Sequence, residues 1–374
     1  MTSFSVVAFK IKNMPINTLA SNADLAVSLS RKDNSVIDGT SEPNQVARLV
    51  AKLPRNLVTA WQPFVQEGSL TVSAAFCHFK PRVKWSSPLQ GKSKAFHSPE
   101  LADLLLIFDV PQADGSRVER ALLIQAKVSS KGSCSLTAEG DLVQRHMYAH
   151  WPAFSVLGRK PSVAKIPDPV NIKGGGQSLQ SRYACVEDDV GADPAWLIEA
   201  GDPTSPNVST VSSFADGGGV SLTLSESLGD GLARMYAGSL GRRSDQADDW
   251  SSLVRYLEEY VVAYTATRKL SHVVPQPGVT APALTSATTF FAGSDCTFPR
   301  YRQVRHLLRG MNDWVNDVRW FQPLHGGGGQ RLGYLMDWPG ESLPGDAPVD
   351  LTEPSFAVIR ISVEQPFVLP EMPS

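Results

Sequence analysis

The chain has 374 residues, of which 42% are hydrophobic and 19% are charged, with a formal net charge of -2 and a pI near 6.4. This length and composition support a substantial buried core, in one large domain or two ordinary ones. No apolar run approaches the roughly 20 residues of a membrane helix. The net charge excludes a basic surface over the whole protein, so nucleic acid would have to bind at local basic patches.

The start of the chain and its cysteines predict where the protein works. Residues 1–6 lack the basic, apolar and small-residue progression of a signal peptide. Four cysteines are widely separated, with the spacing of neither a metal site nor a disulfide framework: Cys77, Cys134, Cys185 and Cys296. Both observations predict reduced thiols in a cytoplasmic protein.

The first predicted elements are a helix and a strand, after an N-terminal segment of residues 1–39. Residues 44–64 carry apolar side chains at helical spacing, and Pro54 is expected to interrupt the helix. Residues 69–79 have the composition of a strand.

The most informative part of the chain is a predicted hairpin. Residues 101–110 and 121–128 are short runs rich in Leu, Ile and Val, typical of strands in a sheet covered on both faces. The residues between them have turn chemistry. Each strand also contains polar groups that a core disfavours, Asp103 in the first and Gln125 and Lys127 in the second.

The alternation of side chains along a strand places Gln125 and Lys127 on one face and Ile124 and Ala126 on the other. Burying an isolated carboxylate or ammonium costs several kcal/mol, so such groups normally persist only when they are paired or hold a metal. The pattern therefore predicts a compact cluster of acid, amide and lysine.

The elements after the hairpin are predicted from composition and periodicity. They are helices at 138–151 and 250–265, strands at 154–157, 181–186 and 356–363, a linker or long loop at 202–219, and a Pro-rich connection at 274–282.

An acid, a hairpin and a terminal x-x-Lys in this order resemble the PD-(D/E)xK nuclease superfamily, which has the restriction-endonuclease-like fold. Asp103 matches the aspartate of that motif, and Gln125-Ala126-Lys127 matches its Asp/Glu-x-Lys, with Gln replacing the commoner acid. Glu42 matches the acid that many members carry on their first helix. The resemblance covers roughly residues 40–157.

This resemblance implies an α/β fold with a mixed central sheet flanked by helices. The nuclease core would span residues 40–190. Residues 191–374 would form a C-terminal α+β accessory region, which either is separate or extends the same domain.

The resemblance also implies hydrolysis of phosphodiester bonds with Mg²⁺, or Mn²⁺, as cofactor. Asp103 would be the central ligand, Glu42 or Glu100 a second, and the side-chain carbonyl of Gln125 a neutral third. Lys127 would orient or deprotonate the attacking water and offset charge on the phosphate. Because Gln125 lacks the usual negative charge, Glu100 is the preferred compensating acid.

Each candidate also has a simpler structural interpretation. Lys127 could extend to water from a strand end, and Asp103 could cap a turn or pair with an arginine. Glu42 could be a favourable acid in the first turn of a helix, and Glu100 could be solvated. His78 could contact phosphate or be a structural residue.

Two basic segments are candidate nucleic-acid contacts. The first lies between the strand at 69–79 and Glu100. The basic residues of the second would lie on one face of a helix, which either contacts a phosphate backbone or is simply solvated. The candidate residues are Lys80, Arg82 and Lys84 in the first segment and Arg302, Arg305 and Arg309 in the second, together with His78 near the end of the preceding strand.

His146 and His150, four residues apart on a predicted helix, would be only half of a zinc site, so a structural or substrate-facing role is preferred. The sequence thus predicts a Mg²⁺-dependent endonuclease acting on nucleic acid, DNA in particular, and by analogy serving bacterial antiviral defence. The alternative is a catalytically silent module of the same fold that binds nucleic acid or a partner protein. Assembly as a homo-oligomer or with a partner defence protein is left open.

Overall fold

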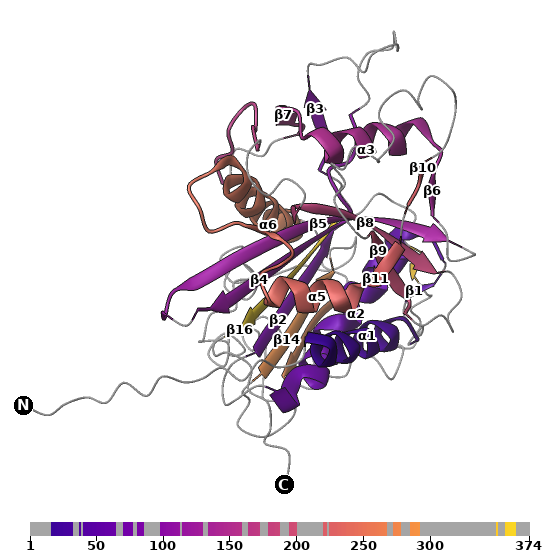
Figure 1. Ribbon diagram of the computed structural model, residues 1–374, viewed down its shortest axis with the longest axis vertical. Helices are drawn as coiled ribbons and strands as arrows, with labels where there is room; N and C mark the ends of the chain where they lie inside the picture. Colours follow the sequence, from indigo (N-terminus) through magenta and orange to yellow (C-terminus); the bar gives the residue numbers. More distant parts are fainter. Residues whose placement is uncertain are drawn as a thin grey trace, which may run out of the picture.

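A ten-stranded mixed sheet forms the centre of the protein, and helices cover both of its faces (Figure 1). The predicted α/β class with a mixed central sheet flanked by helices is confirmed. The structure is a computed structural model that describes residues 16–32, 37–38, 40–64, 70–77, 81–85, 98–112, 114–129, 134–158, 164–172, 179–187, 194–199, 220–222, 224–267, 272–277, 285–291, 349–350 and 356–363.

The strands of the central sheet run in the order β11-β9-β8-β5-β4-β16-β2-β14-β13, and β12 pairs with β5. Their bounds are β2 (Leu70–Cys77), β4 (Leu104–Pro111), β5 (Arg117–Ser129), β8 (Ser181–Glu187), β9 (Trp196–Glu199), β11 (Leu224–Ser227), β12 (Arg242–Arg243), β13 (His272–Pro277), β14 (Thr285–Phe291) and β16 (Phe356–Val363). The two-stranded pairs are β1 (Ile37–Asp38) with β15 (Val349–Asp350), β3 (Val83–Trp85) with β7 (Phe154–Val156), and β6 (Ser135–Leu136) with β10 (Val220–Ser221).

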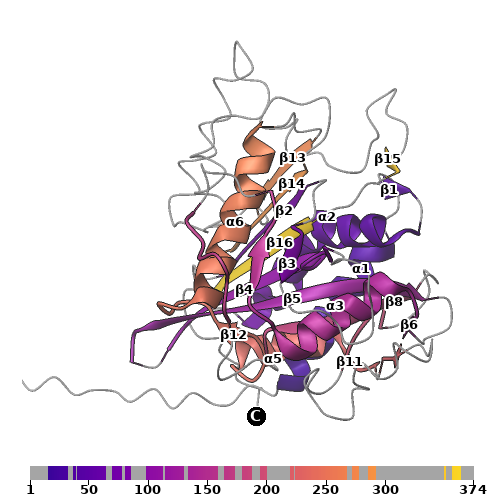
Figure 2. The same cartoon turned by 90° about the horizontal axis from the view of Figure 1, so that it is seen from above.

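The helices divide between the two faces of the sheet, and each face has its own hydrophobic cluster. One face is covered by α1 (Ile16–Lys32), α2 (Glu42–Trp61, continued by the 3-10 turn Gln62–Phe64) and α5 (Leu228–Tyr236). The other is covered by α3 (Glu139–His150) and α6 (Asp249–Thr267). The views in Figures 1 and 2 agree that α3 lies over β5 and β8.

The predicted hairpin is present as β4 and β5, which pair antiparallel. Leu123 of β5 packs in the cluster under α3 and α6, whereas Ile124 and Ala126 pack in the cluster under α1 and α2. This alternation puts the face that bears Gln125 and Lys127 toward α3.

Strand β16, predicted at 356–363, lies between β4 and β2, parallel to the first and antiparallel to the second. All eight of its residues are buried. Its one charged side chain, Arg360, is held by two carboxylates: Nε donates to Glu258 at 2.8 Å and Nη2 donates to Glu119 at 2.6 Å. The paired arginine explains how a charge persists in a strand that is covered on both faces.

Three sequence expectations differ from the structure or fall outside it. Helix α2 continues through Pro54, so the predicted interruption is wrong; the buried stripe that includes Leu53 and Leu57 holds the helix together despite the lost hydrogen bond. Strand β13 occupies part of the expected Pro-rich connection, and its place at the edge of the sheet tolerates proline. The linker predicted at 202–219 lies outside the described residues.

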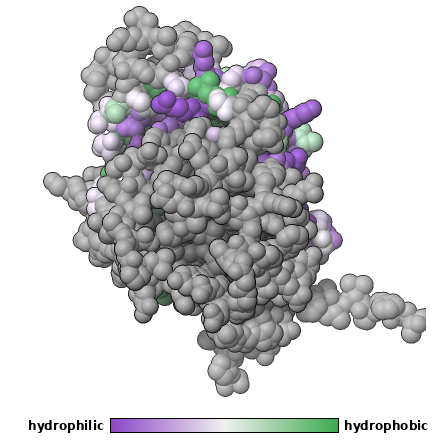
Figure 3. Space-filling model, turned by 180° about the vertical axis from the view of Figure 1, so that it is seen from behind, coloured by the Kyte–Doolittle hydropathy of each residue, from purple (hydrophilic) through white to green (hydrophobic). Residues whose placement is uncertain are grey.

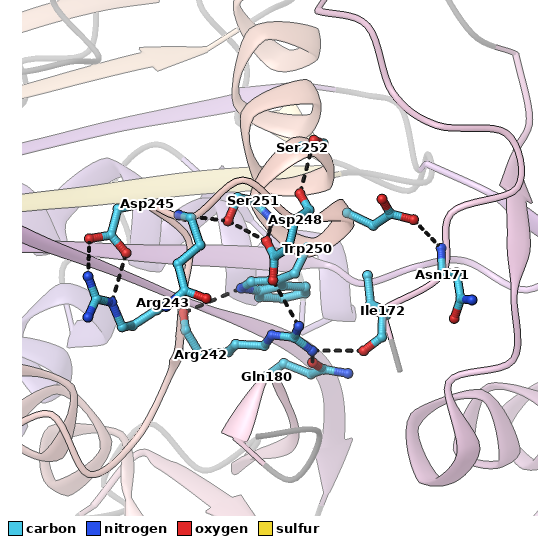
Figure 4. A network of polar contacts seen from close by, with 12 residues as sticks. Asn171, Ile172, Gln180, Arg242, Arg243, Asp245, Asp248, Trp250, Ser251 and Ser252 are labelled. Atoms are coloured by element: carbon cyan, nitrogen blue, oxygen red, sulfur yellow. Dashed lines mark hydrogen bonds and ion pairs between the residues drawn. The ribbon is translucent and has the colours of Figure 1, made fainter. Parts of the chain in front are cut away.

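A polar network fixes the start of α6 against the chain leading into β8 (Figure 4). The guanidinium of Arg242 donates to the main-chain carbonyl of Ile172 at 2.8 Å and to the side-chain carbonyl of Gln180 at 3.0 Å. The other terminal nitrogen of the guanidinium, Nη2, donates to the carboxylate of Asp248 at 2.9 Å. Because β8 pairs with β5, these contacts help to fix the strand beside Gln125 and Lys127.

Candidate active site

Asp103 lies immediately before β4, where its main chain is held from both sides. Its N–H donates to the carbonyl of Ile124 at 3.0 Å, and its carbonyl accepts from the N–H of Ala357 at 2.9 Å. The carboxylate is buried, and its Oδ2 accepts hydrogen bonds from the side-chain amide of Gln125 and, at 2.8 Å, from the N–H of Ala126. The structure therefore brings Asp103 onto the Gln125–Lys127 segment, as the sequence predicts.

Gln125 is 1% exposed and is held at both ends of its amide. Its nitrogen donates to Asp103, and its oxygen accepts from the side-chain nitrogen of Gln144 on α3. The same nitrogen of Gln144 also donates to the main-chain carbonyl of Glu100 at 2.8 Å. These partners define the amide orientation, because a carboxylate can accept but not donate a hydrogen bond.

Two tyrosines form hydrogen bonds between α3 and the sheet or the segment that leads into it. The hydroxyl of Tyr148 donates to the main-chain carbonyl of Leu101 at 2.7 Å, and the hydroxyl of Tyr183 donates to that of Asp141 at 3.3 Å. Burial raises the pKa of both phenols, so each remains a neutral hydrogen-bond donor. They tie α3 to the segment that precedes Asp103 and to β8, the strand that pairs with β5.

A buried ion pair anchors the same helix to β9, which lies two strands from β5 in the sheet. Arg145 on α3 forms two hydrogen bonds with the carboxylate of Glu199 on β9, one of them 2.6 Å long. Its guanidinium also lies 5.4 Å from the centre of the Tyr183 ring. A bidentate contact of this kind fixes orientation as well as distance, and it therefore limits the movement of Gln144 next to it.

Lys127 lies two residues beyond Gln125 on the same face, and its ammonium contacts two carboxylates. Asp141 of α3 is 2.9 Å away, and the two oxygens of Glu42 are 3.4 and 3.5 Å away. Burial lowers the pKa of Lys127, but the charges of Glu42, Asp141 and, less strongly, Asp103 outweigh it, so the pKa lies above its ordinary value. Lys127 is therefore a charged ammonium at neutral pH.

Three carboxylates surround the ammonium of Lys127. Those of Glu42 and Asp141 contact it, and that of Asp103 acts on it electrostatically. Carboxylate oxygens are the ligands that Mg²⁺ prefers. Within the described residues, however, no three His, Cys, Asp or Glu side chains are grouped so that they could hold a metal ion.

The other predicted site residues lie next to this cluster, on or beside β3, or outside the described residues. Glu100 contributes its main-chain carbonyl to Gln144, and its main chain pairs with that of Arg82. Arg82 and Lys84 are exposed on and beside β3. The remaining candidates lie outside the described residues: His78, Lys80, Arg302, Arg305 and Arg309.

Three residues that the sequence reasoning missed come from α3: Asp141, Gln144 and Tyr148. Their spacing of three and then four residues is the signal that could have revealed them, because it places polar side chains on one face of a helix. The rings of His146 and His150, on the same helix, lie 4.4 Å apart.

Comparisons with protein-family models, with curated proteins and with solved structures found no match. None of the helices in the described ranges combines the length and the apolar character needed to cross a membrane.

Proposed function

We propose that this chain is a metal-dependent nuclease with a restriction-endonuclease-like core, which hydrolyses phosphodiester bonds of nucleic acid, DNA in particular. The observation that carries the proposal is the contact between the buried Asp103 carboxylate and the Gln125–Lys127 segment. It joins an acid and a charged lysine that are distant in sequence on one face of the sheet. A merely structural carboxylate would not require a charged lysine on the same segment.

Each polar residue has a part in this proposal. Asp103 and Glu42 would hold Mg²⁺ or Mn²⁺, which when bound would activate water and offset phosphate charge. Gln125 orients the Asp103 carboxylate through its amide nitrogen. Lys127, as an ammonium, would donate hydrogen bonds to a phosphate oxygen or to the attacking water, and the raised pKa disfavours a role as base.

Two basic residues lie at the surface near this site. At the end of the molecule where Figure 1 draws α3, β3 and β7, the described surface in Figure 3 shows hydrophilic residues with hydrophobic ones among them. Arg82 and Lys84 are exposed there and would contact backbone phosphates. We extend the proposal to antiviral defence in a bacterial cytoplasm by analogy with the superfamily that the motif resembles.

The second candidate is a silent module of the same fold that binds nucleic acid or a partner protein. Two observations favour it: Gln125 is neutral, and Lys127 is already engaged by Glu42 and Asp141. In this alternative the polar cluster is structural, and the protein binds DNA without cutting it.

Incubation of the purified protein with plasmid and linear DNA separates the two candidates. The nuclease cuts with Mg²⁺ or Mn²⁺ and not with EDTA, and both Asp103→Asn and Lys127→Ala abolish cutting. Asp114→Asn, in the exposed turn between β4 and β5, is the matched control and should cut normally. Binding without cutting, or cutting that persists in both site variants, would contradict the nuclease proposal.

A further inference from the structure

We propose that Asp141 is a positioning residue for Lys127 and supplies, from helix α3, the negative charge that Gln125 does not supply from strand β5. The inference deepens the proposed nuclease function and rests on it for its catalytic meaning. The ion pair itself is a feature of the fold.

The distances favour Asp141 as the main partner of the lysine. Its Oδ1 lies 2.9 Å from the ammonium, whereas the nearer oxygen of Glu42 lies at 3.4 Å. A contact of 2.9 Å is a good charge-assisted hydrogen bond, and 3.4 Å exceeds that range. Without Asp141, only the longer contact to Glu42 would remain of these two.

The position of Asp141 is coupled to that of Gln125 through α3. Asp141 and Gln144 are three residues apart and therefore face the same direction, toward Lys127 and Gln125 respectively. The Tyr183 hydroxyl holds the main-chain carbonyl of Asp141 from β8. One rigid helix thus positions the lysine through a carboxylate and the glutamine through an amide.

This arrangement answers the charge question that the sequence raises. A neutral Gln125 leaves the site one carboxylate short of the motif that it resembles, and Glu100 is the compensator expected from sequence. The contact that brings Glu100 to the cluster is made by its main-chain carbonyl. Asp141 instead brings a carboxylate into direct contact with the lysine.

A spectroscopic test needs no cleavage activity. The ¹H–¹⁵N spectrum of the lysine ammonium groups should contain a slowly exchanging signal that Lys127→Arg removes. We expect Asp141→Asn to abolish this signal and Asp141→Glu to retain it. Asp245→Asn is the matched control, because Asp245 is likewise part of an ion pair, with Arg243 at 2.8 Å, and is 23% exposed compared with 22% for Asp141.

The second arm measures cleavage and Mn²⁺ affinity. We expect Asp141→Asn to lower kcat roughly 10- to 100-fold with little change in KM, and to weaken Mn²⁺ binding. Adding Gln125→Glu to Asp141→Asn should restore part of the cleavage rate and part of the Mn²⁺ affinity, because it returns a carboxylate to the site.

The outcomes separate the two proposals. A wild-type spectrum without a protected Lys127 signal, or an Asp141→Asn variant that behaves like Asp245→Asn, overturns the positioning role. If the double variant recovers neither Mn²⁺ affinity nor cleavage, the charge-compensation part is wrong. If the wild-type protein does not cut DNA, the nuclease proposal fails, while the ammonium signal still decides whether Asp141 positions Lys127.

Discussion

Replacing Gln144 by Leu should lower the free energy of unfolding by about 2–4 kcal/mol. The amide nitrogen of Gln144 donates to two acceptors, the buried side-chain oxygen of Gln125 and the part-buried main-chain carbonyl of Glu100. Leu fills a similar volume but donates nothing. The unsatisfied buried acceptor costs about 1–3 kcal/mol, and the part-buried carbonyl adds about 1 kcal/mol. Gln125 cannot compensate by turning over, because its nitrogen would then leave the Asp103 carboxylate.

Urea unfolding of the two proteins measures this difference as a shift in midpoint at constant slope. Gln112→Leu is the matched control, because Gln112 is exposed next to the turn between β4 and β5, and it should change stability by no more than about 0.5 kcal/mol. If Gln144→Leu lowers the free energy of unfolding no more than Gln112→Leu does, the chain of hydrogen bonds from α3 to Asp103 does not contribute to stability. The reasoning about how α3 fixes the site would then be wrong.

Three other changes test the packing and electrostatics of the fold. Gly229→Ala should destabilise by about 1–3 kcal/mol in urea unfolding, because a Cβ there would lie 2.5 Å from the carbonyl of Ala20 and would also meet Asp24; equal stability would contradict this. Arg360→Met should cost about 3–5 kcal/mol in the same assay, because it leaves Glu258 buried without its arginine, and a neutral result would show that the pair is dispensable. Burial, and then the charge of His150, lower the pKa of His146 to about 4 from 6.5. The unfolded chain therefore binds a proton that the folded protein excludes, so stability should fall as pH drops from 6.5 to 4. His146→Gln should make the urea midpoint less dependent on pH between 6.5 and 4. An unchanged pH dependence would show that His146 is not the group responsible.

Local pattern predicted the elements that carry the site. Two apolar runs around a polar turn were sufficient to predict β4 and β5, and strand alternation placed Gln125 and Lys127 on one face. The cost of burying charge predicted that Asp103 would meet that segment. These inferences depend only on neighbours in sequence and on the energy of polar groups in a core.

Long-range placement was not available from the sequence. Strand β16 follows β4 by about 250 residues, and nothing in its apolar run indicates that it inserts between β4 and β2. Asp141 was missed for a similar reason, because an acid near the start of a helix is ordinary on its own. It becomes significant only when the packing of α3 on β5 brings it to Lys127.

Helix α1 shows a different limit. Its sequence contains Asn17, Asn22 and Asp24, which are poor helix formers, and it falls in a segment for which no element was predicted. Packing against α2 and α5 outweighs this weak propensity: Asp24 accepts hydrogen bonds from the N–H of Gly229 and the hydroxyl of Ser227 at the start of α5. Tertiary contacts therefore determine this helix.

The most direct test of the proposed site is anomalous diffraction from a crystal of this protein soaked in Mn²⁺. The nuclease proposal predicts a manganese peak within about 2.0–2.4 Å of a carboxylate oxygen of Asp103, with Glu42 as a second ligand and Lys127 beside it. A peak bound only elsewhere, or none at Asp103 at saturating Mn²⁺, would contradict a metal-dependent site at these residues.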